Sequence, residues 1–248
     1  MTGGGFLQAM NLLRERVPGF ERYPFSLPAV RHLTSLELHP AVTFLVGENG
    51  TGKSTLLEAL AVAAGFNAEG GSKDFRFATR RTESELHEYV RLVRRPRREQ
   101  DGFFVRAESL YNVATEIEAL DTAGGGSLLT GYGGRSLHEQ SHGEAFMALA
   151  THRFRGRGLY LLDEPEAALS PTRQLALLVL LNEQVRRRGS QFVIATHSPI
   201  LLAFPEAVIY RLAEAGIAPV AYEETEHFRV THDFLVHREA YLRHLLER

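Results

Sequence analysis

The stretch that decides the fold is Val42-Thr43-Phe44-Leu45-Val46-Gly47-Glu48-Asn49-Gly50-Thr51-Gly52-Lys53-Ser54-Thr55. A short apolar, β-branched run leads into a glycine-rich turn, and the turn opens onto a run of good helix formers from Leu56 to Ala63. Gly47 to Ser54 fits the phosphate-binding loop G-x-x-x-x-G-K-[ST], in the strand–loop–helix context that this motif requires. We therefore predict a strand, a P-loop and a helix here.

The residue types of this loop suit a nucleoside triphosphate with Mg²⁺. Glycines let backbone N–H groups turn inward around a phosphate, and the start of a helix adds unpaired donors and a positive dipole end. Lys53 is predicted to reach the β- and γ-phosphates, and the Ser54 hydroxyl to bind Mg²⁺. The alternative is a glycine turn with an incidental lysine. The predicted nucleotide contacts are Glu48, Asn49, Gly50, Thr51, Gly52, Lys53, Ser54 and Thr55.

Lysine usage supports the P-loop interpretation. Lys53 and Lys73 are the two lysines of the chain, and arginine fills nearly every other cationic position. A compact ammonium can approach a phosphate where a planar guanidinium fits less well. A lysine at this one position of the loop therefore indicates a chemical requirement.

The whole chain has the composition of an ordinary globular protein. Its 248 residues are 44% hydrophobic and 23% charged, and the net charge of −2 gives no global argument for nucleic acid or membrane. Cysteine is absent, which excludes disulfides, thiol chemistry and cysteine-based zinc sites. No signal peptide is recognisable, and the longest aliphatic run, Leu175 to Leu181, is far below the ~20 residues of a membrane helix. We expect a soluble, cytoplasmic protein without membrane insertion.

A second motif lies at the end of a continuous apolar run. Gly158 to Leu162 reads as a buried parallel strand and is followed by Asp163-Glu164-Pro165-Glu166. Open α/β sheets bind ligands at the carboxyl ends of their strands. Asp163 is therefore predicted to bind Mg²⁺, and Glu164 to be the base that aligns the attacking water. The alternative is a charged strand end followed by a proline turn.

One strand later, a histidine takes the corresponding position. Gln191 to Ala195 reads as a buried strand and ends in Thr196-His197-Ser198-Pro199. His197 is predicted to contact the γ-phosphate, although a lone histidine is more often structural. The helix between the two strands is bounded by the Ser170 N-cap with Pro171 at N1, and by Gly189 after Arg186 to Arg188.

Ser141-x-x-Glu144 before an apolar run is a capping box and predicts a helix start. With Gly143 in the first turn, such a start can also bind an anion. Both interpretations can hold at once.

The remaining segments give weaker patterns. We expect a helix over Phe6 to Arg16, strands over Leu33 to Leu38 and Phe103 to Glu108, and a helix over Asn112 to Leu120. We also expect a glycine-rich loop over Thr122 to Gly134 that is mobile without ligand, a hairpin of Val208 to Tyr210 with Ala218 to Tyr222, and an amphipathic terminal helix from Thr231.

Arginines crowd the segment from Lys73 to Arg98, which ends in Arg94-Arg95-Pro96-Arg97-Arg98. One interpretation is a patch that faces nucleic acid or phosphate. The other is a solvated face of a β-rich flap, in which nearby glutamates balance the arginines. We favour this second interpretation because the sequence does not show whether the arginines lie on one side of the molecule.

Taken together, the motifs resemble the ATP-binding cassette (ABC) class of P-loop ATPases across roughly residues 30–200. Gly47–Ser54 resembles the Walker A motif, Leu159–Glu164 the Walker B motif with its catalytic glutamate, and His197 the switch histidine. Ser141 to Glu144, preceded by Gln140, resembles a degenerate signature motif, and Ala167-Ala168-Leu169-Ser170 its D-loop. More narrowly, these segments resemble small bacterial predicted ATPases that are grouped with the SMC/Rad50/RecF branch.

This resemblance implies an α/β P-loop NTPase fold with a mostly parallel core sheet flanked by helices. It implies a core lobe of about 25–107 and 155–248, a helical lobe of about 108–154, and an antiparallel, arginine-rich β flap of about 70–100, in one domain over 1–248. It also implies ATP and Mg²⁺ as ligands, and a nucleotide-sandwich homodimer. In that dimer Ser141 and Gly143 of one copy close over the ATP on the P-loop of the other.

The chain departs from the family pattern in two places. His142 replaces the first signature glycine, and Glu108 stands near the position where the family has a Q-loop glutamine. Tyr23 or Phe25 is the weak candidate for stacking on adenine, because an aromatic residue beside a proline more often packs in a core.

The predicted function is ATP hydrolysis by Glu164, His197 and Lys53, with dimerisation gated by nucleotide. The first alternative is a clamp of low turnover that acts on DNA or a protein partner. A nucleotide-binding subunit of a transporter is the third possibility, and the short helical segment and the missing glutamine count against it.

Overall fold

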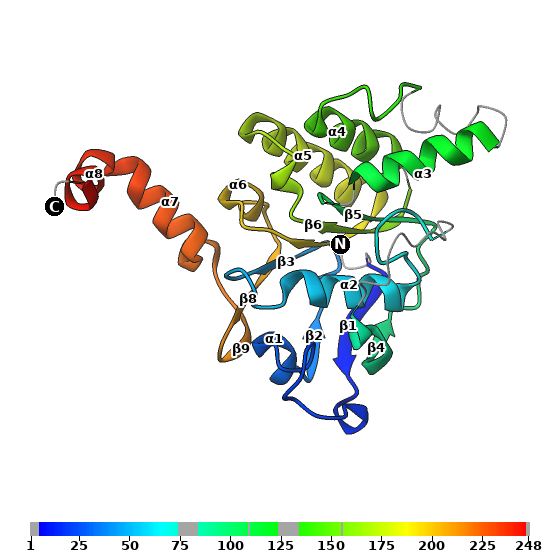
Figure 1. The fold of residues 1–248 in the computed structure, drawn as a ribbon, viewed down its shortest axis with the longest axis horizontal. Helices are drawn as coiled ribbons and strands as arrows, with labels where there is room; N and C mark the ends of the chain where they lie inside the picture. The colour runs from blue at the N-terminus through cyan, green and yellow to red at the C-terminus, as the bar shows by residue number, and fades with distance from the viewer. Residues whose placement is uncertain (1–4, 74–83, 109, 124–133, 155, 247–248) are drawn as a thin grey trace.

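The computed structural model describes residues 5–73, 84–108, 110–123, 134–154 and 156–246. Its centre is a six-stranded sheet in the order β5-β6-β7-β3-β8-β9 (Figure 1). The first four of these neighbouring pairs are parallel, and β8–β9 is an antiparallel hairpin. The strands are β3 (Val42–Val46), β5 (Asp101–Arg106), β6 (Gly158–Asp163), β7 (Gln191–Ala195), β8 (Val208–Ala213) and β9 (Gly216–Pro219). The predicted α/β fold with a mostly parallel core sheet is confirmed.

A second, antiparallel sheet has the order β2-β1-β4. Its strands are β1 (Leu7–Leu12), β2 (Ser35–Glu37) and β4 (Val90–Arg94). The helix predicted over Phe6 to Arg16 is therefore wrong. Leu7, Met10 and Leu12 are buried in this segment, and it is held as a strand by two partners distant in sequence. Only its last residues, Arg14–Arg16, form a short 3-10 turn.

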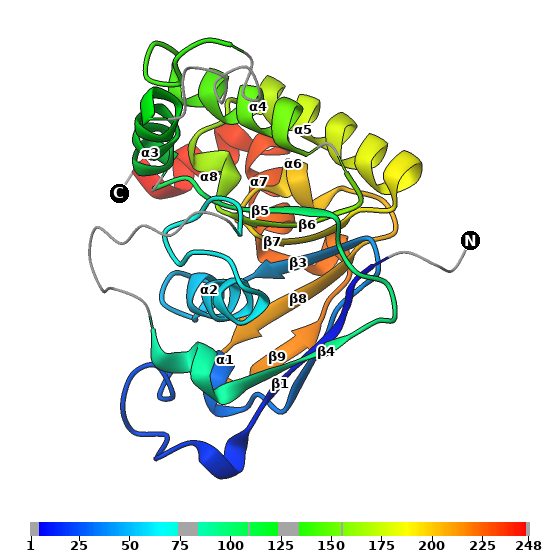
Figure 2. The ribbon, with the colours of Figure 1, turned by 90° about the vertical axis from the view of Figure 1, so that its right-hand side faces the viewer.

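Helices cover both faces of the central sheet (Figure 2). On one face, α2 (Lys53–Ala64) lies between the central sheet and the antiparallel sheet, near the short α1 (Pro28–Arg31). The other face carries α3 (Leu110–Ala123), α4 (His142–Arg153), α5 (Pro171–Glu183) and α6 (Pro199–Leu202). Each face has its own hydrophobic core. Because both faces are covered, every residue of β3, β6 and β7 is buried.

Several local predictions are confirmed. The capping box at Ser141 is formed, and Gly189 adopts a left-handed conformation at the end of its helix. Pro171 begins α5, and a π-helical turn over Gln184–Arg188 follows it. The Ser170 side chain makes no capping hydrogen bond. Most of the glycine-rich loop predicted over Thr122 to Gly134 lies outside the described residues.

Two boundaries near the carboxyl end differ from prediction. The second hairpin strand ends at Pro219, and Tyr222–Glu224 forms a 3-10 turn instead. The single helix expected from Thr231 is two helices, α7 (Glu226–Val236) and α8 (Arg238–Leu246). The helix starts earlier because the Thr225 hydroxyl accepts a hydrogen bond from the Phe228 N–H group.

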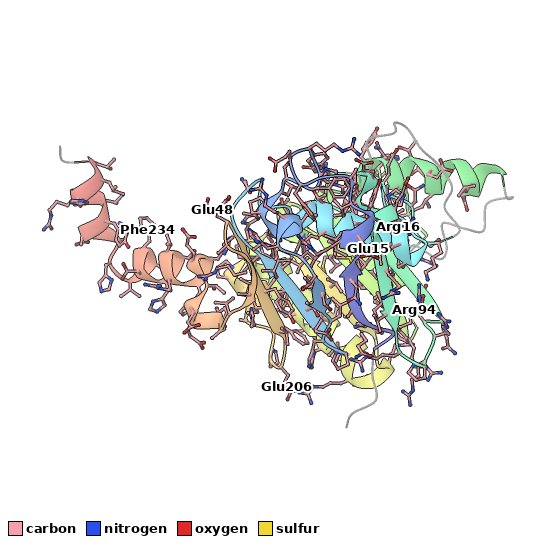
Figure 3. All side chains as sticks on the ribbon, turned by 90° about the horizontal axis from the view of Figure 1, so that it is seen from below. Glu15, Arg16, Glu48, Arg94, Glu206 and Phe234 are labelled. Atoms are coloured by element: carbon pink, nitrogen blue, oxygen red, sulfur yellow. The ribbon has the colours of Figure 1, made fainter. Side chains whose placement is uncertain are left out.

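We call residues 226–246 the arm. It projects away from the body in Figure 1, and Figure 3 shows Phe234 on it, clear of the two sheets. No residue of α7 or α8 counts as buried. Among the described helices, including these two, none combines the length and the apolar character needed to cross a membrane.

Candidate functional site

The P-loop is shaped by glycines with positive φ. Gly47, Gly50 and Gly52 have φ values of 153°, 81° and 102°. At Gly47 a Cβ atom would lie 2.4 Å from the carbonyl oxygen of Leu212, whereas at Gly50 it would meet nothing within 4 Å. Gly47 is therefore required both for its conformation and for the close approach of β8.

Lys53 begins α2 and folds back over the loop. Its ammonium group donates hydrogen bonds to the carbonyl oxygens of Gly47 at 2.9 Å and Glu48 at 3.0 Å. The residue is 4% exposed, and this burial lowers the pKa of Lys53, although the nearby Glu164, Asp163 and Glu166 carboxylates oppose the shift. The ammonium group thus sits between the loop and a cluster of acidic side chains.

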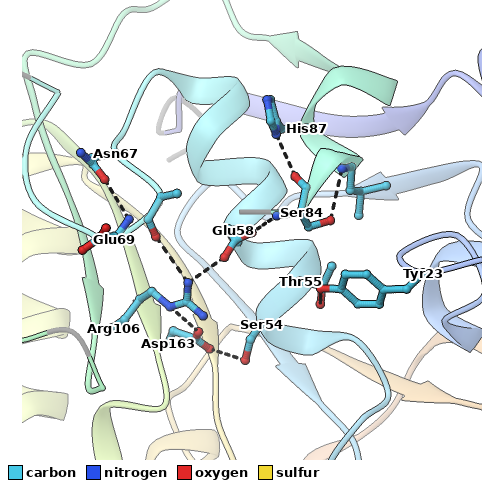
Figure 4. Close-up of polar contacts among 12 residues, drawn as sticks. Tyr23, Ser54, Thr55, Glu58, Asn67, Glu69, Ser84, His87, Arg106 and Asp163 are labelled. Atoms are coloured by element: carbon cyan, nitrogen blue, oxygen red, sulfur yellow. Dashed lines mark hydrogen bonds and ion pairs between the residues drawn. The ribbon is translucent and has the colours of Figure 1, made fainter. Parts of the chain in front are cut away.

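The two residues predicted to bind Mg²⁺ lie side by side. Ser54 Oγ donates a hydrogen bond to Asp163 Oδ1 at 2.9 Å, although 109 residues separate them (Figure 4). Burial raises the pKa of Asp163 to about 6, while Arg106 and the Ser54 hydrogen bond act in the opposite direction. A hydroxyl and a carboxylate are hard oxygen ligands, and Mg²⁺ sites beside phosphates commonly use one or two such groups. The Ser54 hydroxyl and the Asp163 carboxylate therefore fit Mg²⁺ as ligands.

Arg106, at the end of β5, is a residue that sequence reasoning missed. Its guanidinium lies 2.7 Å from Glu58 Oε2 and 3.4 Å from Asp163 Oδ2, and it links three elements (Figure 4). Arg106 pairs in register with Asp163 on the adjacent strand. That neighbourhood was detectable in principle, because the predicted strand over Phe103 to Glu108 places this arginine at the ligand-binding edge of the sheet.

Glu164 follows β6 in a left-handed conformation, with φ 49° and ψ 53°. Its N–H group donates to the carbonyl oxygen of Ala195 at 2.9 Å. This backbone geometry is uncommon for a non-glycine residue and is concentrated at functional sites. The structure brings the Glu164 carboxylate within 3.5 Å of His197 Nε2.

Glu166 is the second residue that sequence reasoning left without a role. Its carboxylate accepts hydrogen bonds from the Thr196 hydroxyl and the His197 N–H group. Burial raises the pKa of Glu166, and these hydrogen bonds lower it. Glu166 therefore holds the turn that carries His197 against the turn that carries Glu164.

His197 has a further partner that no sequence pattern indicated. Its Nδ1 atom lies 2.9 Å from Nε2 of His227, in the first turn of α7. Burial lowers the pKa of both imidazoles, and the positive charge of Lys53 acts in the same direction.

The comparisons with known proteins agree with this geometry. Residues 97–203 match the family described as "AAA domain, putative AbiEii toxin, Type IV TA system", and residues 20–128 match the family described as "AAA domain". The thiamine import ATP-binding protein ThiQ of Mesorhizobium japonicum is 32% identical over 170 residues, which are 64% of this chain and 65% of that protein. ThiQ of Histophilus somni is 27% identical over 168 residues, 62% of this chain and 74% of that protein.

A solved structure described as "An inward-facing conformation of a putative metal-chelate type ABC transporter" shares the fold. The TM-score is 0.50 at 18% identity, over 92% of this chain and 88% of that one. By these matches and by its fold, the chain is similar to the ABC-class P-loop ATPases.

The signature-like helix start at Ser141 does not lie beside the P-loop within one chain. Ser141 and Glu144 form the capping box, and Arg173 of α5 contacts both side chains, at 3.3 Å and 3.2 Å. A Cβ at Gly143 would meet Arg173 and the carbonyl oxygen of Ala168. The helix α4 lies on the face of the central sheet opposite to α2 (Figure 2).

The two aromatic candidates for adenine stacking, Tyr23 and Phe25, differ in their exposure to solvent. Phe25 is fully buried and packs edge-on against Tyr89, so the prediction for this residue is wrong. Tyr23 is 60% exposed, and its hydroxyl lies 3.5 Å from Thr55 at the start of α2 (Figure 4). Tyr23 stays a prediction.

A pocket of about 530 Å³ adjoins the P-loop. Gly47 to Thr51 form one wall, and Thr225 to His227 at the root of the arm form part of the other. The arm therefore begins beside the P-loop.

Proposed function

We propose that this chain binds ATP with Mg²⁺ and hydrolyses it. The observation that carries the proposal is the 2.9 Å contact between Ser54 Oγ and Asp163 Oδ1, beside the buried ammonium group of Lys53. It supports one site with hard oxygen ligands and a cation for the β- and γ-phosphates. Mg²⁺, when bound there, would neutralise phosphate charge.

The positions of Glu164 and His197 support a role for both residues in the hydrolytic step. A carboxylate at the end of β6 can align and deprotonate a water molecule that attacks the γ-phosphate. The imidazole of His197, 3.5 Å from that carboxylate, can donate from Nε2 to a phosphate oxygen. Glu48, Asn49, Gly50, Thr51, Gly52 and Thr55 would surround the phosphates from the loop.

We also propose that two copies complete the site. Ser141 and Glu144 are exposed at the start of α4, on the face opposite to α2. A second copy in antiparallel orientation could bring Ser141 and Gly143 over the γ-phosphate, where the helix N-terminus would favour negative charge. Dimerisation would then depend on the triphosphate.

Lysine substitutions test nucleotide binding. Lys53→Ala is expected to weaken ATP affinity at least about tenfold, because charge-assisted contacts of this type contribute more than ~1.4 kcal/mol. Lys73→Ala is the matched control, because Lys73 pairs with Glu99. Isothermal titration of both variants with ATP and Mg²⁺ measures the difference. Equal affinities in the two variants would place the nucleotide elsewhere.

The substitution Glu164→Gln tests hydrolysis and dimerisation together. Loss of the base is expected to lower kcat by about 10²–10⁴-fold while ATP still binds. Size-exclusion chromatography with ATP and Mg²⁺ should then show a stable dimer that disappears without nucleotide. Hydrolysis at the wild-type rate would exclude Glu164 as the base, and a monomer at saturating ATP would exclude the sandwich.

The similarity to thiamine import proteins favours a second candidate, the ATP-binding subunit of a transporter. In this chain, Arg106 lies near the position where the family has its coupling glutamine, and it forms ion pairs with Glu58 and Asp163. A subunit of this kind would co-purify with a membrane-embedded partner when isolated in detergent from its native host. Full turnover by the purified chain alone argues against it.

A nucleic-acid partner is the third candidate, and its test is salt dependence. Among the arginines of the predicted patch, Arg94 pairs with Glu99 at 3.1 Å, which reduces the net positive charge there. ATPase activity that rises with DNA and falls steeply with salt would support this partner. ATPase activity that changes with neither DNA nor salt would exclude a nucleic-acid partner.

A further inference from the structure

The imidazole of His197 is held by a second imidazole that belongs to the arm. His197 Nδ1 and His227 Nε2 are 2.9 Å apart, a hydrogen-bond distance, and the ring centroids are 5.0 Å apart. A hydrogen bond between two neutral rings needs an N–H group on exactly one of the two facing nitrogens. The tautomer of one histidine therefore determines the tautomer of the other.

The position of His227 is fixed by the root of the arm. The Thr225 side chain, 1% exposed, caps α7 by accepting from the Phe228 N–H group. The Tyr222 hydroxyl donates to the carbonyl oxygen of Pro199 at 3.0 Å, just after His197 in the chain. These contacts anchor the first turn of α7 against the turn that carries His197.

The surroundings of His197 favour one of the two tautomer pairs. Its Nε2 atom is buried without a hydrogen-bond partner among the described residues, and the Glu164 carboxylate lies 3.5 Å from it. A carboxylate attracts an N–H group and repels a lone pair. His197 is therefore expected to carry its proton on Nε2, which leaves Nδ1 as the acceptor of an N–H donated by His227.

We propose that His227 is a positioning residue that keeps His197 in the Nε2–H tautomer and fixes the direction of its ring. The inference rests on the proposed function, in which this Nε2–H group donates to the γ-phosphate. Exchange of the proton to the other tautomer would turn a lone pair toward the phosphate and the Glu164 carboxylate. Because His227 lies on α7, the state of the switch histidine depends on where the arm sits.

Three substitutions of His227 test whether its side chain acts on His197 as a hydrogen-bond donor or as an acceptor. His227→Gln supplies an amide N–H near the position of the original Nε2 and should keep the tautomer. His227→Glu offers only an acceptor and should draw the proton to Nδ1 of His197 or make it an imidazolium. His227→Ala removes the contact. The control is His232→Glu, an exposed histidine on the same helix.

The first measurement needs no nucleotide. In ¹⁵N-histidine-labelled full-length protein, the His197 signals are identified by comparison with His197→Asn. The wild type, His227→Gln and His232→Glu should show a protonated Nε2 and an unprotonated Nδ1 at pH 8. His227→Glu should show a protonated Nδ1. A protonated Nδ1 in the wild type, or no change in His227→Glu, would overturn the proposal.

The second measurement is steady-state ATP hydrolysis. His227→Ala and His227→Glu should lower kcat at least about tenfold with KM for ATP within about twofold, because the P-loop contacts that bind ATP are unchanged. His227→Gln should stay within about threefold of wild type. A loss of kcat in His227→Gln equal to that in His227→Ala would show that His227 acts only by packing, and it would contradict the proposal. A wild-type chain with the expected tautomer but no hydrolysis would refute the proposed function and leave the tautomer assignment supported.

Discussion

At the scale of single residues, the P-loop combines positions that look alike in sequence and differ in their surroundings. Gly47 and Gly50 both have positive φ, but only Gly47 faces another chain segment at close range, the carbonyl oxygen of Leu212. A side chain at Gly50 would be strained by its backbone alone. A side chain at Gly47 would also push β8 away from β3.

Alanine substitutions at these two glycines should therefore differ. We expect Gly47→Ala to lower the free energy of unfolding by about 2–3 kcal/mol, because the added Cβ forces a backbone shift. Gly50→Ala should cost about 1 kcal/mol, the usual cost of a left-handed conformation with a Cβ. Urea unfolding of both variants without nucleotide measures the contrast. Equal losses would show that β8 moves freely away from the loop.

At the scale of elements, one buried side chain joins the amino-terminal strand to the central sheet. The Gln191 side chain, at the start of β7, accepts from the N–H groups of Phe6 and Leu7, and donates to the carbonyl oxygens of Leu7 and His39. The strand β1 thus depends on an amide 184 residues away from Leu7. This dependence explains why local pattern alone predicted a helix there.

Removal of this amide should uncouple the two sheets. Gln191→Leu leaves four backbone groups, three of them buried, without this partner, and we expect a loss of about 2–4 kcal/mol in the free energy of unfolding. The exposed Gln8→Leu on β1 is the control and should change it by less than about 0.5 kcal/mol. Hydrogen exchange should show β1 losing protection before β7. Unchanged stability in Gln191→Leu would contradict this role.

At the scale of the whole molecule, the arm stands apart from two well-packed cores. The helix α8 packs on α7, where the Tyr241 hydroxyl donates a hydrogen bond to Asp233. Its Leu245 and Leu246 side chains are 61% and 74% exposed. The body of the protein therefore gains little stability from α8.

Deletion of α8 tests this separation. A chain that ends at His237 should unfold with a free energy within about 0.5 kcal/mol of the full chain, because no residue of α8, Arg238–Leu246, is buried. It should also retain ATP hydrolysis, because His227 remains. A chain that ends at Pro219 loses Thr225 and His227 and should lose most of its turnover. Thermal unfolding and ATPase assays on both chains check the prediction, and marked destabilisation by the shorter deletion would contradict it.

The sequence by itself determined the P-loop, the buried parallel strands, the capping box and the acidic strand end. Each of these is a local pattern: glycines before a helix, a continuous apolar run, or a residue pair three positions apart. The order of such motifs was enough to predict the α/β fold and to bring Ser54 and Asp163 to one edge of the sheet, because carboxyl ends of parallel strands share that edge.

Only the tertiary structure decided β1, the contacts of Arg106 and the pairing of His197 with His227. These features join residues from distant parts of the chain, and their geometry depends on strand order, register and the angle at which α7 leaves the body. Phe25 illustrates the same limit, since its burial against Tyr89, which residue type did not reveal, excludes it as a candidate for adenine stacking. Local patterns specify conformations and strand ends, whereas long-range packing determines which side chains meet there.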